Sequence, residues 1–256
     1  MIEIDGSYGE GGGQLLRMAL AFSSIFGEPI RVFNIRAGRS NPGIQAQHLM
    51  AVKSAVLLTG GRAEGACVGS SAIEYFPERP KGGNFDLDIG TAGSVTLVLQ
   101  AFLPIALMAE KTVSGRIIGG TEVRWSPTAD YFDRVFLSAV RRMGARLSLR
   151  LIKSGYYPKG GGSVEFEVEP ACEIKPLNLV RPPEQVWVNG VSRCQNLPQS
   201  VAERQSVAAR KFLMARGIEV RQIGIFSVKD ALGVGSSITL WADGTSEIYV
   251  WGDALG

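Results

Sequence analysis

The chain has 256 residues, of which 45% are hydrophobic and 20% are charged, and its formal net charge is +3. This length can bury a large core, and the composition argues against a disordered protein. A charge this small does not by itself indicate nucleic-acid binding, and three distant cysteines without CxxC spacing argue against a disulfide framework or a cysteine zinc site.

The chain also lacks the sequence features of export and of membrane insertion. Met1–Asp5 contains acidic side chains, and it lacks the basic region followed by an apolar region that is typical of a signal peptide. The longest apolar stretch, Leu97–Ala109, is interrupted by Gln100 and Pro104 and is too short to span a membrane. We therefore expect a cytoplasmic protein.

Residues 1–80 are expected to form a βαβαββ unit. Apolar runs alternate with Gly-rich turns, and the first helix directly follows the turn Gly9–Gly13. The expected elements are a strand at Met1–Asp5, a helix at Gln14–Phe26, a strand at Arg31–Arg36, a helix at Pro42–Leu58, and strands at Glu64–Gly69 and Ala72–Phe76.

Residues 81–170 repeat this order, again with a Gly-rich turn, Gly90–Ser94, before the first helix. Residue identity between the two copies is weak, so the repeat rests on the order of elements. Each unit can lay two helices on one face of a small sheet, which predicts an α+β fold of repeated units. The expected elements are a strand at Phe85–Ile89, a helix at Val95–Ala109, a strand at Val113–Ile118, a helix at Ser126–Met143, and strands at Ala145–Ile152 and Ser163–Val168.

A third unit is expected to start at about residue 174, with a strand at Leu177–Val180. The prolines of Arg181-Pro182-Pro183 then interrupt it. The repeat core is therefore assigned to residues 1–184, with a small inserted α+β domain at residues 185–256 and the third unit incomplete. The expected elements of the insert are strands at Val186–Cys194, Glu219–Phe226, Ser237–Ala242 and Glu247–Trp251, and a helix at Ser200–Arg216 that starts with a Ser200/Glu203 capping box and ends at Gly217.

The turn before the first helix, Gly9–Gly13, is the first candidate for a binding or catalytic site. Glycines let a backbone approach an anion closely, and a helix N-terminus offers free N–H groups. Arg17, one turn into the helix, could add a fork of donors for phosphate, and Glu10 would suit a divalent cation next to a triphosphate. The alternative is a purely structural turn, since the pattern is neither a Walker A nor a GxGxxG motif.

The second candidate is the basic segment Pro29–Ala63, which contains no Asp or Glu. Arg36 and Arg39 lie three apart in a Gly/Pro loop that leads into a helix carrying Gln47 and His48. Such a one-signed surface attracts phosphate, although it could equally be a solvated basic edge. His48 is the only histidine, which excludes a metal site built from several histidines.

The third candidate is Gly155–Val164, where three glycines and a proline inside a β-hairpin demand a special backbone path. Lys159 adds a weak indication of phosphate binding. Nucleophile motifs such as GxSxG are absent from the sequence.

Together these segments resemble the RNA 3′-terminal phosphate cyclase family in their order and spacing. As a set they are specific, although each one is weak alone, and the similarity covers essentially the whole chain. The family's fold, repeated βαβαββ units with a small domain inserted in the last, agrees with the repeat. The matching positions are Asp5-Gly6, Gly9-Glu10-Gly11-Gly12-Gly13-Gln14, Arg17, Arg36, Gly38-Arg39, Pro42-Gly43, Gln47-His48, Gly90-Thr91-Ala92-Gly93-Ser94, Thr96–Gln100, Gly155, Pro158 and Gly160-Gly161-Gly162.

The resemblance implies ATP-dependent conversion of an RNA 3′-terminal phosphate to a 2′,3′-cyclic phosphate. In the family a histidine takes AMP from ATP and passes it to the RNA phosphate, which the neighbouring 2′-OH then attacks. The implied ligands are ATP, a divalent cation (Mg²⁺ or Mn²⁺) and RNA with a 3′-phosphate. Carried over by position, Glu10 would bind the metal, and phosphates would be held by Arg17, Arg36 and Arg39. Gln47 and His48 would line the site, Gln100 would contact the nucleotide and Pro127 would border its pocket. The catalytic set is Glu10, Arg17, Arg39 and His48.

The chain departs from the family pattern in its length and at Ser154. The family's nucleophilic histidine and a nucleotide-contacting aspartate loop come from a C-terminal segment without counterpart here, and His48 matches a different position. Ser154 stands where the family usually has a basic residue. These residues are either part of a longer cyclase or a natural short form without adenylylation. An unfinished third unit would leave apolar faces uncovered, which favours the former unless a partner or self-association covers them.

Two other functions fit parts of the pattern. A non-catalytic RNA-binding relative, acting in RNA processing or ribosome biogenesis, would also lack the nucleophile, but Glu10, Arg17, Arg39 and His48 make a metal and phosphate pocket that a pure binder has less need for. The enolpyruvyl transferases share the fold at a distance, and no residue pattern here indicates their sugar or shikimate pockets.

Overall fold

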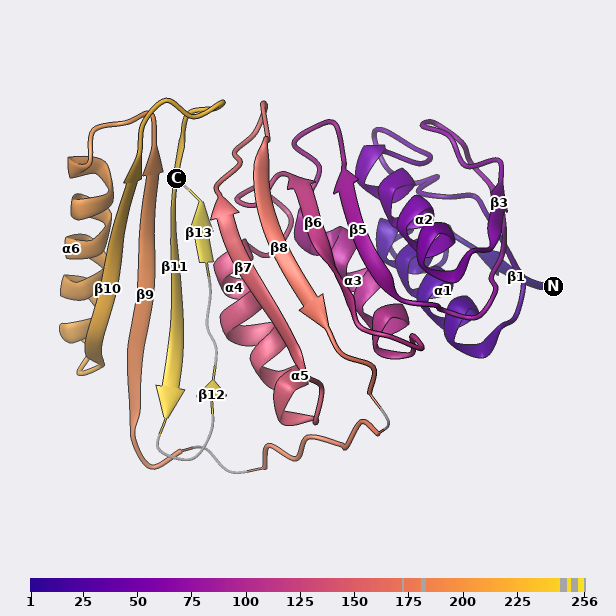
Figure 1. The fold of residues 1–256 in the computed structure, drawn as a ribbon. Coiled ribbons are helices and arrows are strands. Elements are labelled where there is room, and N and C mark those ends of the chain that lie inside the picture. Colours follow the sequence, from indigo (N-terminus) through magenta and orange to yellow (C-terminus); the bar gives the residue numbers. More distant parts are fainter. Residues whose placement is uncertain (172, 181–182, 245–247, 250–252, 256) are drawn as a thin grey trace.

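The structure, a computed structural model, describes residues 1–256 except 172, 181–182, 245–247, 250–252 and 256. The described residues form three sheets that lie next to one another (Figure 1). The first unit lies at the right of Figure 1, the second unit in the middle, and the sheet of residues 186–255 at the left. No helix in the described part of the chain is long and apolar enough to cross a membrane.

The first unit has the predicted βαβαββ order. Its sheet has the strand order β1-β2-β4-β3, with β1 and β2 parallel and the other pairs antiparallel. Two helices accompany this sheet. The elements are β1 (Ile2–Asp5), α1 (Gly13–Phe26), β2 (Ile30–Phe33), α2 (Ala46–Thr59), β3 (Arg62–Glu64) and β4 (Ile73–Phe76).

The second unit repeats the topology of the first. Its order, β5-β6-β8-β7, has the same parallel first pair and the same antiparallel pairs, which confirms the repeated α+β fold. The elements are β5 (Gly83–Asp88), α3 (Val95–Leu107), β6 (Val113–Gly119), α4 (Ala129–Tyr131), the π-helix η1 (Phe132–Leu137), α5 (Ser138–Arg142), β7 (Leu147–Lys153) and β8 (Gly162–Val168).

The two units share one hydrophobic core, and α3 lies at its centre. Helices α1, α2 and α3 pack against one another, and α3 is buried along almost its whole length. Phe102 on α3 meets Phe85 and Phe166 edge to face, with ring centroids 6.1 and 5.3 Å away. The side chains of both units therefore form a single cluster.

Several element boundaries differ from the prediction for reasons that lie in the backbone. β2 ends at Phe33 and not at Arg36, because Asn34 and Arg36 adopt positive φ angles of 53° and 55°. α2 starts at Ala46 and not at Pro42, because the amides of Gly43 and Ile44 donate to the carbonyls of Ile35 and Ser70, both at 2.9 Å. A loop tied across the unit in this way cannot be helical.

The helix expected at Ser126–Met143 is shorter and interrupted. It begins at Ala129, where the Thr128 hydroxyl accepts a hydrogen bond from the amide of Tyr131 at 3.1 Å. Its middle turns are π-helical, and Arg141 braces them by donating to the carboxylate and to the backbone carbonyl of Asp133, at 2.7 and 3.3 Å.

The third sheet has the order β10-β9-β11-β12, with β13 also on β11, and α6 packs on it. β9 pairs in parallel with β10 and antiparallel with β11. The boundaries assigned above between repeat core and insert stay a prediction. The elements are β9 (Val186–Gln195), α6 (Ser200–Met214), β10 (Glu219–Val228), β11 (Gly235–Gly244), β12 (Ile248–Tyr249) and β13 (Asp253–Leu255).

The structure differs from the expectation at Ser200 and at Leu177–Val180, and it describes only part of the strand expected at Glu247–Trp251. The capping box at Ser200 was wrong, because Gln199 is the N-cap and its side chain donates to Glu203 at 2.8 Å. Leu177–Val180 forms no strand. Of the strand expected at Glu247–Trp251, Ile248–Tyr249 is present as β12, whereas Glu247, Val250 and Trp251, like Arg181 and Pro182, lie outside the described residues.

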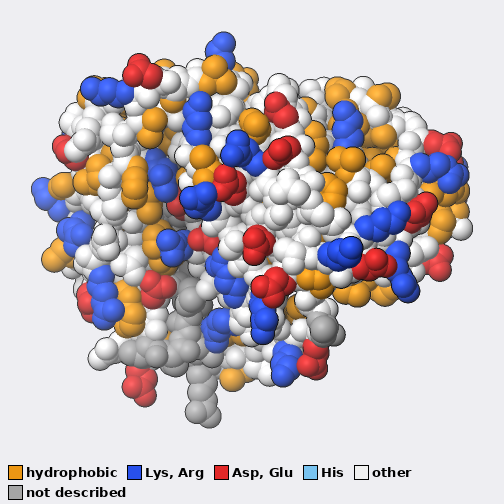
Figure 2. All heavy atoms as spheres, in the orientation of Figure 1, with side chains coloured by type: hydrophobic (Ala, Val, Ile, Leu, Met, Phe, Trp, Pro, Cys, Tyr) orange, Lys and Arg blue, Asp and Glu red, His pale blue; other side chains and the backbone are white. Residues whose placement is uncertain are grey.

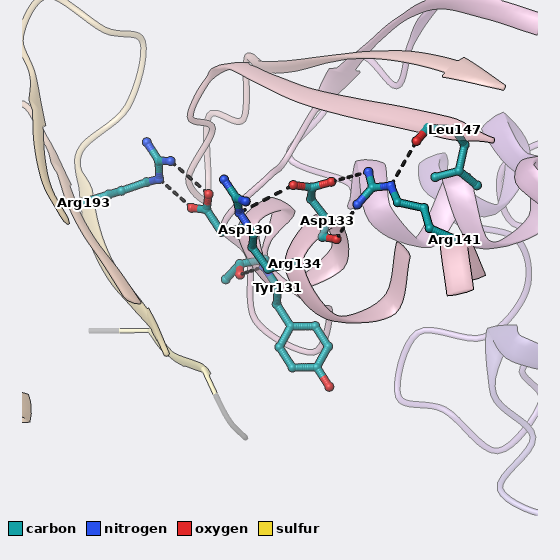
Figure 3. A network of polar contacts seen from close by, with 8 residues as sticks. Asp130, Tyr131, Asp133, Arg134, Arg141, Leu147 and Arg193 are labelled. Atoms are coloured by element: carbon teal, nitrogen blue, oxygen red, sulfur yellow. Dashed lines mark hydrogen bonds and ion pairs between the residues drawn. The ribbon is translucent and has the colours of Figure 1, made fainter. Parts of the chain in front are cut away.

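A largely buried ion pair joins the third sheet to the second unit (Figure 3). Arg193 on β9 donates twice to Asp130 on α4, at 2.6 and 3.0 Å, and the two side chains are only 18% and 14% exposed. Burial alone would lower the pKa of Arg193, but the bonds to Asp130 raise it above its usual value. Two hydroxyl pairs, Thr128–Thr239 at 2.8 Å and Tyr156–Ser237 at 3.0 Å, cross the same boundary.

We predict that Asp130→Ala lowers the free energy of unfolding by roughly 2–4 kcal/mol, because it leaves the Arg193 guanidinium buried without its carboxylate. Urea unfolding followed by circular dichroism would measure the change. The matched control is Glu169→Ala, which removes an exposed partner of Arg146 and should cost less than about 1 kcal/mol. Equal losses in the two variants would contradict the importance of the buried pair.

Candidate phosphate and nucleotide site

The N-terminus of α1 is open toward solvent and lacks a side-chain cap. Its N-cap is Gly12, which makes no side-chain hydrogen bond, and its first turn contains no acidic residue. The turn before it depends on glycine, because Gly9 and Gly11 have φ angles of 61° and 57°. The helix therefore presents free N–H groups and the positive end of its dipole.

Two predicted site residues press against this helix start. A Cβ atom on Gly12 would lie 3.2 Å from Nη2 of Arg39, and one on Gly13 would overlap the ring of His48. Only glycine at these positions lets the arginine and the imidazole come this close to the backbone. The second candidate segment therefore lies against the first.

His48 is buried, at 4% exposure. Its Nδ1 accepts a hydrogen bond from the amide of Gln45 at 3.2 Å, which assigns the ring proton to Nε2 on the side of Gly13. Burial lowers the pKa of His48 to about 4, with further lowering from the nearby charges of Arg36 and Arg17.

Arg17 forms the floor of the site. It is buried, its Nη2 lies 3.5 Å from Oε1 of Gln100, and its Nε has no hydrogen-bond partner. Burial lowers the pKa of this guanidinium. A buried arginine with an unsatisfied donor is costly unless an anion meets it, so this position fits a phosphate group.

Arg39 and Glu10 lie at the mouth of the site, 3.4 Å apart and exposed. Such an exposed pair is weak and can exchange partners when a ligand arrives. Among the described residues, no group of three or more His, Cys, Asp or Glu side chains could hold a metal ion. A lone carboxylate still fits Mg²⁺, which is commonly held by one or two carboxylates together with substrate phosphates.

Arg36 has a structural role in addition to its charge. Its Nη1 donates to the backbone carbonyls of Asn41 and Gly43, at 2.6 and 2.8 Å, and so braces the loop that carries Arg39. The rest of the basic segment is partly neutralised, because Arg31 pairs with Glu3 and Arg62 with Glu64. Figure 2 likewise shows basic and acidic side chains interspersed over the face seen in Figure 1.

Gln47 and Pro127 meet at the start of α3. Oε1 of Gln47 accepts a hydrogen bond from the amide of Ser94 at 2.9 Å, so a first-unit residue caps the Gly-rich turn of the second unit. Thr96 bonds both to Ser94 and to the carbonyl of Pro127, at 2.8 and 2.9 Å. Thr96 belongs to the stretch Thr96–Gln100 that resembles the cyclase family, but no individual role was expected for it.

A second cleft, with a volume of about 510 Å³, adjoins this region through Gln47. The third candidate segment forms part of its wall through Tyr156 and Tyr157. The carbonyl of Gly155, just before them, accepts from the amides of Thr121 and Glu122 at 3.0 and 3.1 Å. Lys159 is exposed and Ser154 is buried. The lining residues are Gln47, Ala92, Glu122, Val123, Arg124, Trp125, Tyr156, Tyr157, Val234, Gly235 and Ser236.

Comparison with known proteins identifies the family to which the chain belongs. Residues 8–244 match the model of the family described as RNA 3′-terminal phosphate cyclase, a span that includes the motif residues of the site. The chain belongs to the RNA 3′-terminal phosphate cyclase family. Proteins of that name from Archaeoglobus fulgidus, Pyrococcus furiosus and Pyrobaculum neutrophilum are 48%, 47% and 45% identical to it. Each alignment covers 100% of this chain and 75%, 74% and 73% of the relative.

We predict that His48 titrates with a midpoint near pH 4, because burial and two nearby arginines disfavour its charged form. Since it is the only histidine, its ring protons give a single NMR titration curve. The folded-state pKa lies below the ordinary 6.5, so neutral His48 stabilises the fold fully above pH 6.5. That contribution, about 3 kcal/mol in total, is lost as the pH falls from 6.5 to 4.

A midpoint near 6.5 would show that the imidazole is solvated and that the assigned tautomer is wrong. The matched comparison is His48→Gln, which keeps a polar side chain and does not titrate. As the pH is lowered from 6.5 to 4, the unchanged chain should lose unfolding free energy relative to His48→Gln. Carboxylate titration affects both proteins equally and cancels in the difference.

Proposed function

We propose that this site takes part in the ATP-dependent conversion of an RNA 3′-terminal phosphate to a 2′,3′-cyclic phosphate through adenylylated intermediates. The observation that carries the proposal is buried Arg17, with its unsatisfied Nε, close to His48, whose ring meets an uncapped helix N-terminus. All three features favour a phosphate group, and membership of the cyclase family supplies the reaction.

The residues of the chain act by holding phosphates and orienting them. Arg17 and the first turn of α1 bind phosphate oxygens from the interior, and Arg39 binds them from the mouth after releasing Glu10. His48 donates from Nε2 without adding charge. A divalent cation held by Glu10 and the phosphate oxygens would neutralise part of the charge that develops during transfer.

Activation by AMP makes the chemistry feasible at neutral pH. Transfer of AMP to the RNA 3′-phosphate creates a phosphoanhydride, and the neighbouring 2′-OH attacks the RNA phosphorus atom. A new phosphate–O2′ bond forms, AMP leaves with the electrons of the broken anhydride bond, and the 2′-OH proton is lost. Positioning by the arginines brings the 2′-OH in line with the leaving AMP.

His48 is assigned to phosphate binding and not to nucleophilic attack. Its Nδ1 is occupied by the amide of Gln45, and its Nε2 faces the backbone at Gly13. Attack on the α-phosphate of ATP would require a free ring nitrogen with its lone pair directed at phosphorus. These residues therefore bind ATP and the RNA end without themselves carrying AMP.

We predict that Arg39→Ala weakens binding of ATP and of RNA with a 3′-phosphate by roughly 1.5–3 kcal/mol, the value of a lost charge-assisted contact. Isothermal titration calorimetry would measure both affinities. The matched control, Arg62→Ala, removes an arginine of the same basic segment that pairs with Glu64, and should leave both affinities unchanged. Unchanged affinities in Arg39→Ala would overturn the phosphate site.

A second prediction concerns the covalent step. After incubation of this chain with ATP and Mg²⁺, we expect calorimetry to detect ATP binding and intact mass spectrometry to detect no stable addition of AMP. A gain of one AMP that disappears in His48→Gln would contradict the assignment of His48. RNA binding without ATP binding would instead favour a non-catalytic RNA-binding relative.

A further inference from the structure

The second cleft has an aromatic rim that the phosphate site does not use. Trp125 is 97% exposed and Tyr157 is 77% exposed, and both line this cleft. Burying apolar surface stabilises a fold, and the exposed indole of Trp125 contributes none of that stabilisation. Trp125 also has a φ angle of 66°, an uncommon conformation for a bulky residue.

The loop that carries Trp125 is held in place on both sides. Before it, the amide of Glu122 donates to Gly155, and after it the Ser126 hydroxyl donates to the carbonyl of Val123 at 3.0 Å. The carbonyl of Pro127 accepts from Thr96 on α3 at 2.9 Å. The backbone that carries the exposed indole is therefore held by hydrogen bonds. A ligand that stacks on the indole loses little free energy to ordering this loop.

The charges around the rim indicate which ligand fits. Arg124 lines the cleft and Lys159 follows Tyr157 by two residues; both are exposed, and neither has an acidic partner within the described part of the chain. Exposed aromatic rings next to such cations are the usual platform for single-stranded nucleic acid.

The cleft is also in the right place for an RNA strand that enters the phosphate site. Gln47 lines the cleft, while the next residue, His48, packs against the start of α1. The first turn of α2 thus borders both sites. Gln100 and Pro127, which are expected to contact ATP, are not among the residues that line this cleft, so the adenine of ATP is not its natural occupant.

We propose that Trp125 and Tyr157 form a stacking platform for a nucleobase of single-stranded RNA, upstream of the nucleotide that carries the 3′-phosphate. The direction of the strand rests on the proposed function, because it places the 3′-phosphate at Arg17 and Arg39. The stacking is sequence-tolerant, since every base has an aromatic face.

The test uses a short single-stranded RNA, labelled at its 5′ end and ending either in a 3′-phosphate or in a 3′-OH. Fluorescence anisotropy measures its affinity for the unchanged chain, Trp125→Ala, Trp125→Phe and Arg39→Ala. A control, Phe212→Ala, removes an exposed ring on α6 that is not part of the cleft. ATP affinity is measured for every variant by calorimetry.

We expect Trp125→Ala to weaken binding of both RNAs about tenfold or more, and Trp125→Phe, which keeps an aromatic face, to weaken it less than about threefold. Phe212→Ala should change neither affinity, and ATP affinity should be the same in all variants at position 125. Replacing the penultimate base by an abasic site should abolish the difference between the unchanged chain and Trp125→Ala.

The outcomes separate the platform from the proposed function. If RNA binds with a preference for the 3′-phosphate that Arg39→Ala removes, while Trp125→Ala has no effect, the platform is wrong and the phosphate site stands. If Trp125→Ala weakens RNA binding but the 3′-phosphate and Arg39 make no difference, the platform stands and the phosphate site falls. Loss of ATP affinity in Trp125→Ala, or no RNA binding at all, overturns the platform.

Discussion

The close packing of helices α1, α2 and α3 is the constraint on which the candidate site depends. These helices come from two different units, and the start of α1 packs against α2 where Gly13 leaves no room for a Cβ atom and Gly12 leaves little. At that point the ring of His48 and the guanidinium of Arg39 lie directly against the backbone of α1. A methyl group on Gly13 would overlap the His48 ring, and one on Gly12 would crowd the end of the Arg39 side chain, so the proposed phosphate site and the core packing depend on the same contacts.

The second consequence of this packing is electrostatic. Arg17, Arg36 and Arg39 gather around one helix N-terminus, so positive charge is concentrated where burial already penalises it. The fold limits this cost in two ways: His48 stays neutral, and Arg36 is tied to backbone carbonyls. The remaining unsatisfied donor, Nε of Arg17, is what a bound phosphate would satisfy. The unpaired donor destabilises the free protein, and a bound anion would remove that cost. The free energy recovered in this way adds to the affinity for the anion.

The internal repeat shows how one motif acquires two different uses. Both units place a Gly-rich turn before their first helix, and both sheets have the same strand order. In the second unit the turn is closed, because Ser94 caps α3 and Gln47 binds the amide of Ser94. In the first unit the equivalent turn has no side-chain cap. Only the first copy is therefore open to an anion, and the second serves to fasten the two units together.

The α+β repeat and the chemical types of the site residues follow from the order of residues along the chain. Apolar periodicity and Gly-rich turns located most helices and strands, and arginines next to a glycine turn indicated phosphate. These patterns were less reliable at boundaries such as the start of α2 and at Ser200, because hydrogen bonds across the unit and the neighbouring Gln199 decided where those helices begin.

Only the tertiary structure decided which of these residues act together. Arg17 and Gln100 are 83 residues apart in the chain, and Gln47 and Ser94 are 47 apart, so neither contact follows from local pattern. The low pKa of His48 depends on burial by elements that no local motif specifies. The exposure of Trp125 depends on a loop pinned by α3 and by the hairpin after β7. Burial and electrostatic fields are sums over neighbours in space, whereas a motif records only neighbours along the chain.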